Sequence, residues 1–228
     1  HRKEKKIDSM KTPHVYLPGS TDAAVIMLHG YGADMNDLAP LRDYLDPQGL
    51  WHWYFPNGPV RVPFGGMWEG RAWFPIDMAE LERAMQENRH RHFADKRPPE
   101  FVGSLDMMHA ELEALRERHP TIVLGGFSQG AMMASHLAAR LGPRALIILS
   151  GTLIDRAGLE ANSPENAVPF FQSHGDSDPL LSLAQAKDLY QVLEQKGWSG
   201  LWAPFRGGHE IPAPVLKTLS HFLTQVLK

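Results

Sequence analysis

The 228-residue chain has 43% hydrophobic and 21% charged residues, a composition typical of a globular protein with a full core. Its formal net charge of −3 argues against nucleic acid as the main partner, and the lack of cysteine excludes disulfides, thiolate catalysis and cysteine-bound zinc. No apolar run approaches the ~18 residues of a membrane span, and no signal-peptide pattern follows the basic start. We expect one cytoplasmic domain over 1–228, with 1–12 as a flexible extension and no stable membrane insertion.

Strands and helices alternate along the chain. In chain order, the predicted elements are strands at 14–17 and 23–28, a helix ending near 45, a strand at 51–55, helices at 78–93 and 100–119, a strand from 121, a helix over 131–139, strands at 145–149 and 168–172, a helix at 183–196, a strand at 200–205 and a helix at 211–227. Residues 57–77, rich in glycine and proline, are expected to be irregular. The alternation predicts an α/β fold with a mostly parallel sheet and helices on both faces.

The turn at 126–130 has the sequence Gly-Phe-Ser-Gln-Gly, a G-x-S-x-G motif between an apolar strand and a helix-prone run. A serine on such a sharp turn projects its hydroxyl clear of the sheet, and the two motif glycines let neighbouring backbone pass close to it. The following helix directs free N–H groups and its positive dipole end at the site where an oxyanion would form. We therefore predict that Ser128 is a nucleophile.

A serine nucleophile needs a base and a group that orients the base. In α/β-hydrolases these partners follow in the order serine, acid, histidine, and the turns after two later strands supply Asp178 and His209 in that order. Position alone does not show whether Asp178 or Asp176 is the acid. The alternative role for Asp176 is to shape the loop through an Asx-type turn. His29 and His174 also lie beside the expected site, and we interpret them as residues that shape their loops.

Four motifs taken together resemble the carboxylesterase, phospholipase and acyl-protein thioesterase branch of the α/β-hydrolases. They are Leu28-His-Gly-Tyr-Gly-Ala-Asp34, Gly126-Phe-Ser-Gln-Gly130, His174-Gly-Asp-Ser-Asp-Pro179 and Gly208-His-Glu210. The resemblance extends from about Val25 to Phe222 and implies an α/β-hydrolase fold. Two departures are an alanine at position 131, where many relatives have glycine, and a charged stretch over 80–99 that is longer than in compact members.

The resemblance also assigns roles to residues. The family pattern places the acid on Asp178 and the base on His209, and it places the oxyanion donors on the backbone N–H groups of Tyr31 and Gln129. It further implies that Leu180 and the segment 71–76 border the acyl pocket.

We extend that expected pocket wall over 64–76, because methionine and large aromatic side chains suit an aliphatic chain. The side chains concerned are Phe64, Met67, Trp68, Trp73 and Phe74.

The expected activity is hydrolysis of carboxylic esters with short to medium acyl chains through an acyl-enzyme, without a metal or organic cofactor. The expected partner is a small ester or acyl substrate, and similarity to related proteins suggests a homodimer. Two alternatives stay open within enzymes, an acyl-protein thioesterase and a lysophospholipase, because the same triad serves all three. A non-catalytic binding protein on the hydrolase fold is the alternative from another class.

Overall fold

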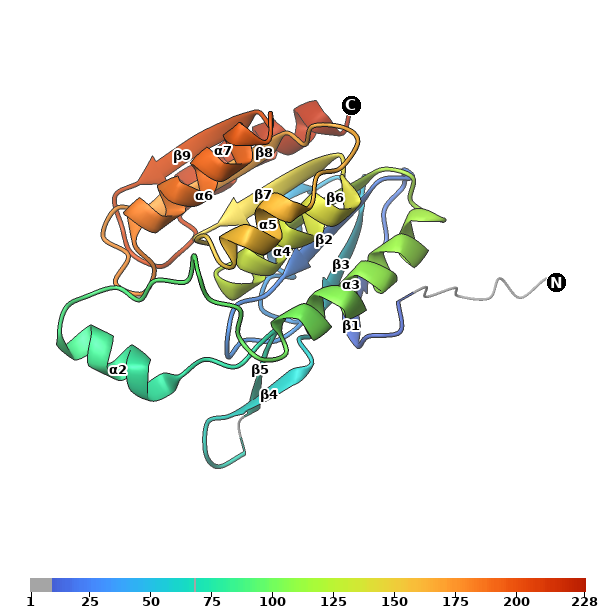
Figure 1. Cartoon of the computed structure of the whole chain (residues 1–228). Helices are drawn as coiled ribbons and strands as arrows, with labels where there is room; N and C mark the ends of the chain where they lie inside the picture. The colour runs from blue at the N-terminus through green and yellow to red at the C-terminus, as the bar shows by residue number, and fades with distance from the viewer. Residues whose placement is uncertain (1–9, 68) are drawn as a thin grey trace.

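A computed structural model describes residues 10–67 and 69–228 and contains a seven-stranded sheet (Figure 1). All neighbouring strands are parallel except the pair β1–β3, which is antiparallel. From one edge to the other, the strands are β1 (His14–Leu17), β3 (His52–Pro56), β2 (Ala24–Leu28), β6 (Ile122–Phe127), β7 (Ala145–Leu149), β8 (Phe170–Gly175) and β9 (Gly200–Phe205). The prediction of a mostly parallel α/β sheet is confirmed.

The central strands are continuous apolar runs because both of their faces are buried. Alternate residues of β2 enter opposite cores: Ile26 packs under one layer of helices, and Val25 and Met27 pack under the other. The first layer comprises α3 (Phe101–Arg116), α4 (Gln129–Leu141), α5 (Arg156–Ala161) and α6 (Leu183–Gln195). The second comprises α1 (Leu41–Leu45) and α7 (Ala213–Val226). No helix in the described residues is both long and apolar enough to span a membrane.

Two predicted stretches differ from the structure. The segment 57–77 is not wholly irregular, because β4 (Val60–Pro63) and β5 (Glu69–Ala72) form an antiparallel hairpin. The predicted helix at 78–93 is the short helix α2 (Met78–Gln86), which Asp77 caps by accepting a hydrogen bond from the Glu80 N–H. The chain leaves the helix at Asn88, whose φ of 51° is left-handed. Figure 1 shows α2 set apart from the other helices.

Residues 10–12, which we expected to belong to a flexible extension, contact the folded domain. Residues 1–9 lie outside the described residues, but Met10 is buried in the core beneath α3. The Lys11 and Thr12 N–H groups both donate to the carboxylate of Glu111, at 2.9 Å and 3.2 Å. Residues 10–12 are therefore part of the folded domain.

Helix α4 carries a buried histidine that predicts how stability depends on pH. His136 donates from Nε2 to the Ile154 carbonyl at 2.8 Å, and burial lowers the pKa of His136 from 6.5 to about 4. Because the unfolded chain binds this proton more tightly, the stability from neutral His136 is present above pH 6.5 and is lost as the pH falls towards 4. When the pH falls from 7 to 4.5, the free energy of unfolding measured in urea should decrease in the wild type by about 2 kcal/mol more than in His136→Gln. Equal losses would contradict this account.

Candidate active site

Ser128 stands on a strained turn between β6 and α4. Its φ of +57° is left-handed, a conformation that non-glycine residues adopt only when the surrounding structure holds them there. The flanking glycines explain how the turn closes. A Cβ on Gly126 would lie 2.3 Å from the Gly130 carbonyl carbon, and one on Gly130 would lie 2.0 Å from the Leu28 oxygen. The predicted strand–turn–helix geometry is therefore present.

A chain of hydrogen bonds connects three side chains from three different loops. His209 Nε2 lies 2.8 Å from Ser128 Oγ, and His209 Nδ1 lies 2.7 Å from Asp178 Oδ2. Asp178 follows β8 and His209 follows β9, so parallel strands bring both residues to the same sheet edge as the turn after β6. The imidazole also packs against Phe127, with ring centroids 4.9 Å apart.

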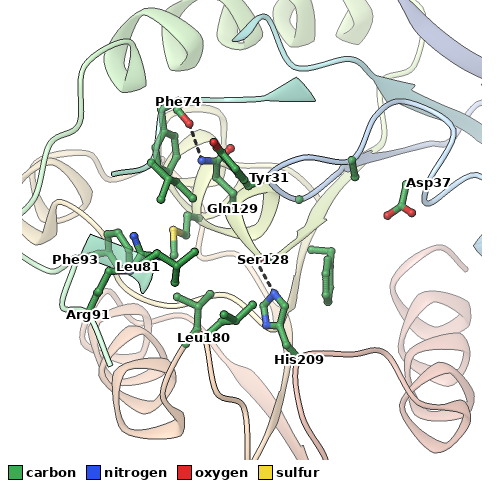
Figure 2. A pocket seen from close by; sticks show the side chains of 16 residues that line it. Tyr31, Asp37, Phe74, Leu81, Arg91, Phe93, Ser128, Gln129, Leu180 and His209 are labelled. Carbon is green, nitrogen blue, oxygen red and sulfur yellow. Dashed lines mark hydrogen bonds between the residues drawn. The ribbon is translucent and has the colours of Figure 1, made fainter. Parts of the chain in front are cut away.

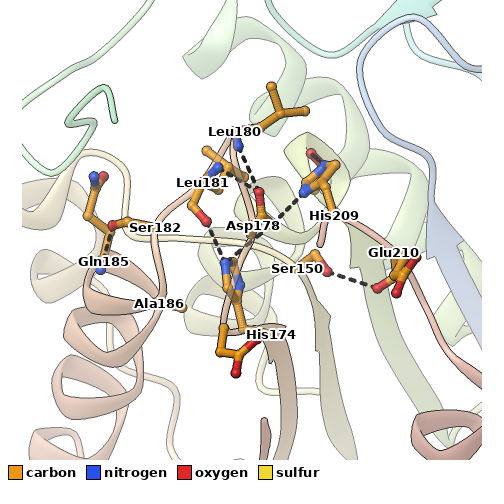
Figure 3. Close-up of polar contacts among 12 residues, drawn as sticks. Ser150, His174, Asp178, Leu180, Leu181, Ser182, Gln185, Ala186, His209 and Glu210 are labelled. Atoms are coloured by element: carbon orange, nitrogen blue, oxygen red, sulfur yellow. Dashed lines mark hydrogen bonds and ion pairs between the residues drawn. The ribbon is translucent and has the colours of Figure 1, made fainter. Parts of the chain in front are cut away.

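The two candidate aspartates have different contacts, and Figure 3 shows those of Asp178. Asp178 is buried, and its Oδ1 accepts hydrogen bonds from the Leu180 and Leu181 N–H groups, each at 2.9 Å. Burial by itself raises the pKa of Asp178, but the hydrogen bonds from His209 and these N–H groups outweigh it and lower that pKa overall. The carboxylate is therefore charged and oriented.

Asp176 is exposed and does not contact His209. Its Oδ1 accepts a hydrogen bond from the Gly207 N–H at 3.1 Å, which ties the loop after β8 to the loop after β9. Asp176 therefore shapes the loop, which was its alternative role in the sequence analysis.

His29 and His174 also hold loops, as we expected. His29 donates from Nδ1 to the Gly30 carbonyl at 2.7 Å and accepts at Nε2 from the Gly58 N–H at 2.9 Å. His174 donates from Nε2 to the Leu181 carbonyl at 2.6 Å, and the same atom lies 3.4 Å from Asp178 Oδ2. Burial lowers the pKa of both histidines, so both are neutral near pH 7.

The predicted oxyanion donors lie next to Ser128. Gln129 is the first residue of α4, so its N–H has no intrahelical acceptor. Tyr31 follows Gly30, whose Cβ position lies only 3.4 Å from Ser128 Cβ. Tyr31, Gln129 and Ser128 line the same cavity, which is the arrangement that the prediction requires.

This cavity has a volume of about 200 Å³ and opens beside Ser128 and His209 (Figure 2). Its wall is mostly apolar, with two charged residues, Asp37 and Arg91. The apolar side chains are those of Ala33, Phe74, Ile76, Leu81, Phe93, Phe127, Met132, Leu180 and Leu181.

The predicted pocket residues divide into two groups. Phe74 and Leu180 line the cavity. Trp73 does not: its side chain is fully buried behind the wall, and its Nε1 donates to the His29 carbonyl at 2.9 Å. Phe64 and Met67 are exposed near the β4–β5 turn and are also absent from the wall, and Trp68 lies outside the described residues.

Residues 13–227 match the family model described as phospholipase/carboxylesterase. The chain belongs to this family. Acyl-protein thioesterase 1 of Gibberella zeae is 30% identical over 220 residues, which cover 90% of this chain and 91% of that protein. Acyl-protein thioesterase 1 homolog 1 of Dictyostelium discoideum is 26% identical over 214 residues, with coverages of 90% and 91%. The crystal structure of esterase PE8 is 26% identical in sequence and has a TM-score of 0.77. The match covers 95% of this chain and 100% of that structure.

Membership of the phospholipase/carboxylesterase family makes the chain a hydrolase of the carboxylesterase and acyl-protein thioesterase group. The described residues contain no cluster of three His, Asp or Glu side chains suited to a metal ion. The alanine at position 131 fits because its neighbour is small: a Cβ on Gly151 would lie 2.5 Å from the Ala131 methyl group.

The longer charged stretch, the second departure from the phospholipase/carboxylesterase pattern, supplies part of the cavity wall. Leu81, Arg91 and Phe93 all reach the cavity, and the sequence reasoning missed them. The one feature of the sequence that pointed to these three residues was the extra length of the stretch 80–99. The apolar residues Leu81 and Phe93 within an otherwise charged run were consistent with a wall, but nothing in the sequence indicated which surface they cover.

In this family member the Gln129 side chain also holds the cavity wall in place. Its Oε1 accepts from the Trp73 N–H at 2.7 Å, and its Nε2 donates to the Phe74 carbonyl at 2.8 Å, with all three residues buried. Gln129→Leu leaves both backbone groups unpaired, so we expect a loss of about 2–4 kcal/mol in the free energy of unfolding by urea. Gln191→Leu, at an exposed position of α6, is the matched control. Equal effects of the two substitutions would rule out a stabilising role for these two Gln129 hydrogen bonds.

Proposed function

We propose that the protein is a serine carboxylesterase that hydrolyses esters through an acyl-enzyme on Ser128. The observation that carries this proposal is the chain of hydrogen bonds from Ser128 through His209 to Asp178, whose Ser128 end lies in the mostly apolar cavity. A hydroxyl, an imidazole and a buried carboxylate in this order form the arrangement that activates serine for acyl transfer.

In the proposed reaction, Ser128 Oγ attacks the ester carbonyl carbon while His209 Nε2 accepts the hydroxyl proton. Asp178 accepts the Nδ1 hydrogen bond, which fixes the imidazole tautomer and stabilises the imidazolium that forms. The lowered pKa of Asp178 keeps its carboxylate charged through the neutral range.

In the proposed reaction the oxygen of the tetrahedral intermediate becomes negatively charged, and the N–H groups of Tyr31 and Gln129 donate hydrogen bonds to it. One such donor is worth about 2.7–4 kcal/mol of transition-state stabilisation. His209 then protonates the leaving alcohol as the bond between the acyl carbon and the alcohol oxygen breaks. Water attacks the acyl-enzyme by the same sequence, and the products are a carboxylic acid and an alcohol.

The cavity supports short to medium acyl chains. Its volume of about 200 Å³ holds a chain of several methylene groups, and its wall offers Phe74, Leu81, Met132 and Leu180 as apolar contacts.

Thioester hydrolysis is the second candidate, favoured by the relatives named acyl-protein thioesterase 1. The test is a matched panel of 4-nitrophenyl esters and acyl thioesters with chains of two to sixteen carbons. Carboxylesterase activity predicts the highest kcat/KM on esters with four to eight acyl carbons. A maximum on long-chain thioesters would favour the second candidate, and no turnover of any substrate would favour a non-catalytic binding protein.

A further inference from the structure

An arginine lies on the wall of the mostly apolar cavity. Arg91 is half-buried and lines the space beside Ser128 together with Leu81 and Phe93. Figure 2 shows Arg91 and Asp37 at opposite ends of the cavity, with Ser128 between them. A guanidinium at one end of an apolar chamber is costly to desolvate unless an anion binds it.

In the part of the chain that the structure describes, no carboxylate forms an ion pair with Arg91. Arg91 Nε is buried without a hydrogen-bond partner among the described residues, and the guanidinium lies 4.9 Å from the centroid of the Phe93 ring. Stacking on an aromatic face leaves the N–H edge of a guanidinium available to a planar anion.

The two carboxylates whose charges act on Arg91 are engaged elsewhere. Glu80 pairs with Arg83 at 3.0 Å and with Arg89 at 2.9 Å. Asp77 accepts the Glu80 N–H at the start of α2. Arg91 therefore retains bonding capacity that its neighbours do not use.

The backbone of Arg91 is held in place by the rest of the domain. Its carbonyl accepts a hydrogen bond from Gln185 Nε2 at 2.7 Å, and Gln185 is a buried residue of α6. The preceding residue, His90, donates from Nε2 to the Asp178 carbonyl at 2.8 Å. The segment that carries Arg91 is thus anchored to the loop that carries Asp178, and a residue that recognises a substrate benefits from such support.

We propose that Arg91 selects ester substrates whose acyl chain ends in a carboxylate, so that the protein hydrolyses half-esters of dicarboxylic acids. This inference rests on the proposed esterase function and adds a substrate class to it. A carboxylate accepts two parallel hydrogen bonds from a guanidinium, while the methylene groups of the chain contact the apolar wall. Hydrolysis breaks the bond between the acyl carbon and the alcohol oxygen, water supplies the new hydroxyl, and the products are a dicarboxylic acid and an alcohol.

The test compares substrates that differ only in one charge. The mono-4-nitrophenyl esters of adipic and suberic acids are matched with esters whose far carboxylate is replaced by a primary amide. We expect the wild type to prefer the acid over the amide by about tenfold or more in kcat/KM, equivalent to ~1.4 kcal/mol. Butyrate esters of 4-hydroxybenzoic acid and 4-hydroxybenzamide test whether the charge is read on the alcohol side instead.

Three variants test whether Arg91 causes the preference for the acid over the amide substrate. Arg91→Met should reduce the acid-to-amide ratio to about one, and Arg91→Lys should keep a smaller preference because it retains the charge without the planar fork. Arg61→Met is the matched control, since Arg61 is an exposed residue of β4 outside the cavity, and it should keep the wild-type ratio. If Arg91→Met does not fold, as judged by circular dichroism, the wild-type ratio and Arg91→Lys decide.

The inference is overturned if the wild type shows no preference for the acid, if Arg91→Met and Arg91→Lys leave the ratio unchanged, or if only the alcohol-side charge matters. Turnover of neutral 4-nitrophenyl butyrate separates this failure from failure of the proposed function. Neutral ester hydrolysis without an acid preference rejects the role of Arg91 alone. No turnover of any ester rejects the esterase proposal itself.

Discussion

Ser128→Ala is expected to lower kcat/KM for 4-nitrophenyl butyrate by about 10⁴-fold or more, because it removes the atom that forms the acyl-enzyme in the proposed mechanism. In enzymes that use this chemistry, loss of one member of the triad removes most of the rate enhancement, and the residual rate comes from binding and the oxyanion donors. Initial-rate kinetics with a correction for background hydrolysis measure the effect.

The matched control for this variant is Ser177→Ala. Ser177 is an exposed serine on the loop that carries Asp178, and its Oγ donates to Asp176. We expect its kcat/KM to stay within about threefold of the wild type, since one exposed hydrogen bond contributes about 1 kcal/mol or less. Retention of full activity in Ser128→Ala would remove Ser128 from the mechanism.

Asp178→Asn is expected to lower kcat by about 10⁴-fold with little change in folding. The asparagine oxygen can still accept the N–H groups of Leu180 and Leu181, which bind Asp178 Oδ1. The amide nitrogen then faces His209 Nδ1 in place of an oxygen, and this favours the imidazole tautomer with its proton on the nitrogen that faces Ser128. That tautomer cannot accept the serine proton.

The neighbouring Asp176→Asn substitution makes the same chemical change two residues away and serves as the control. Its amide oxygen can still accept the Gly207 N–H, so the tie between the two loops is kept. We expect kcat to change by less than about threefold, because Asp176 is exposed and makes no hydrogen bond to the imidazole, and an exposed charge contributes little. Equal losses in both variants would contradict the assignment of the acid to Asp178.

The fold was predictable because its strands are unusually explicit in the sequence. The runs at 24–28 and 145–149 are buried along their whole length, and a continuous apolar run bounded by turns is typical of a parallel strand with helices on both faces. The turn at 126–130 was also predictable, since its glycines are required wherever backbone passes within van der Waals distance.

The interval between β3 and α3 was harder to predict. Glycine and proline at 57–66 concealed the β4–β5 hairpin, whose strands have only four residues each. The charged run that follows has helix-forming residues well past Gln86, but Asn88 turns the chain, and Arg91 and Phe93 line the cavity from irregular backbone. Tertiary contacts there override local propensity.

The site was predictable in its order along the chain but not in its fine contacts. Residue types and spacing cannot separate Asp176 from Asp178, because only the hydrogen bonds of the loop show which carboxylate faces His209. The direction of a side chain in an irregular segment is equally hidden. Trp73 therefore points behind the wall, whereas Arg91 reaches the cavity from a run that resembles a solvated surface.

The central claim is that Ser128 is a nucleophile activated by His209, and covalent labelling tests it most directly. The wild type is treated with a fluorophosphonate probe, digested and mapped by mass spectrometry, with Ser128→Ala and His209→Ala in parallel. We predict stoichiometric modification of the peptide that contains Ser128, no modification in Ser128→Ala, and labelling at least about a hundredfold slower in His209→Ala. Modification of another serine, or labelling at the wild-type rate without His209, would contradict the proposed mechanism.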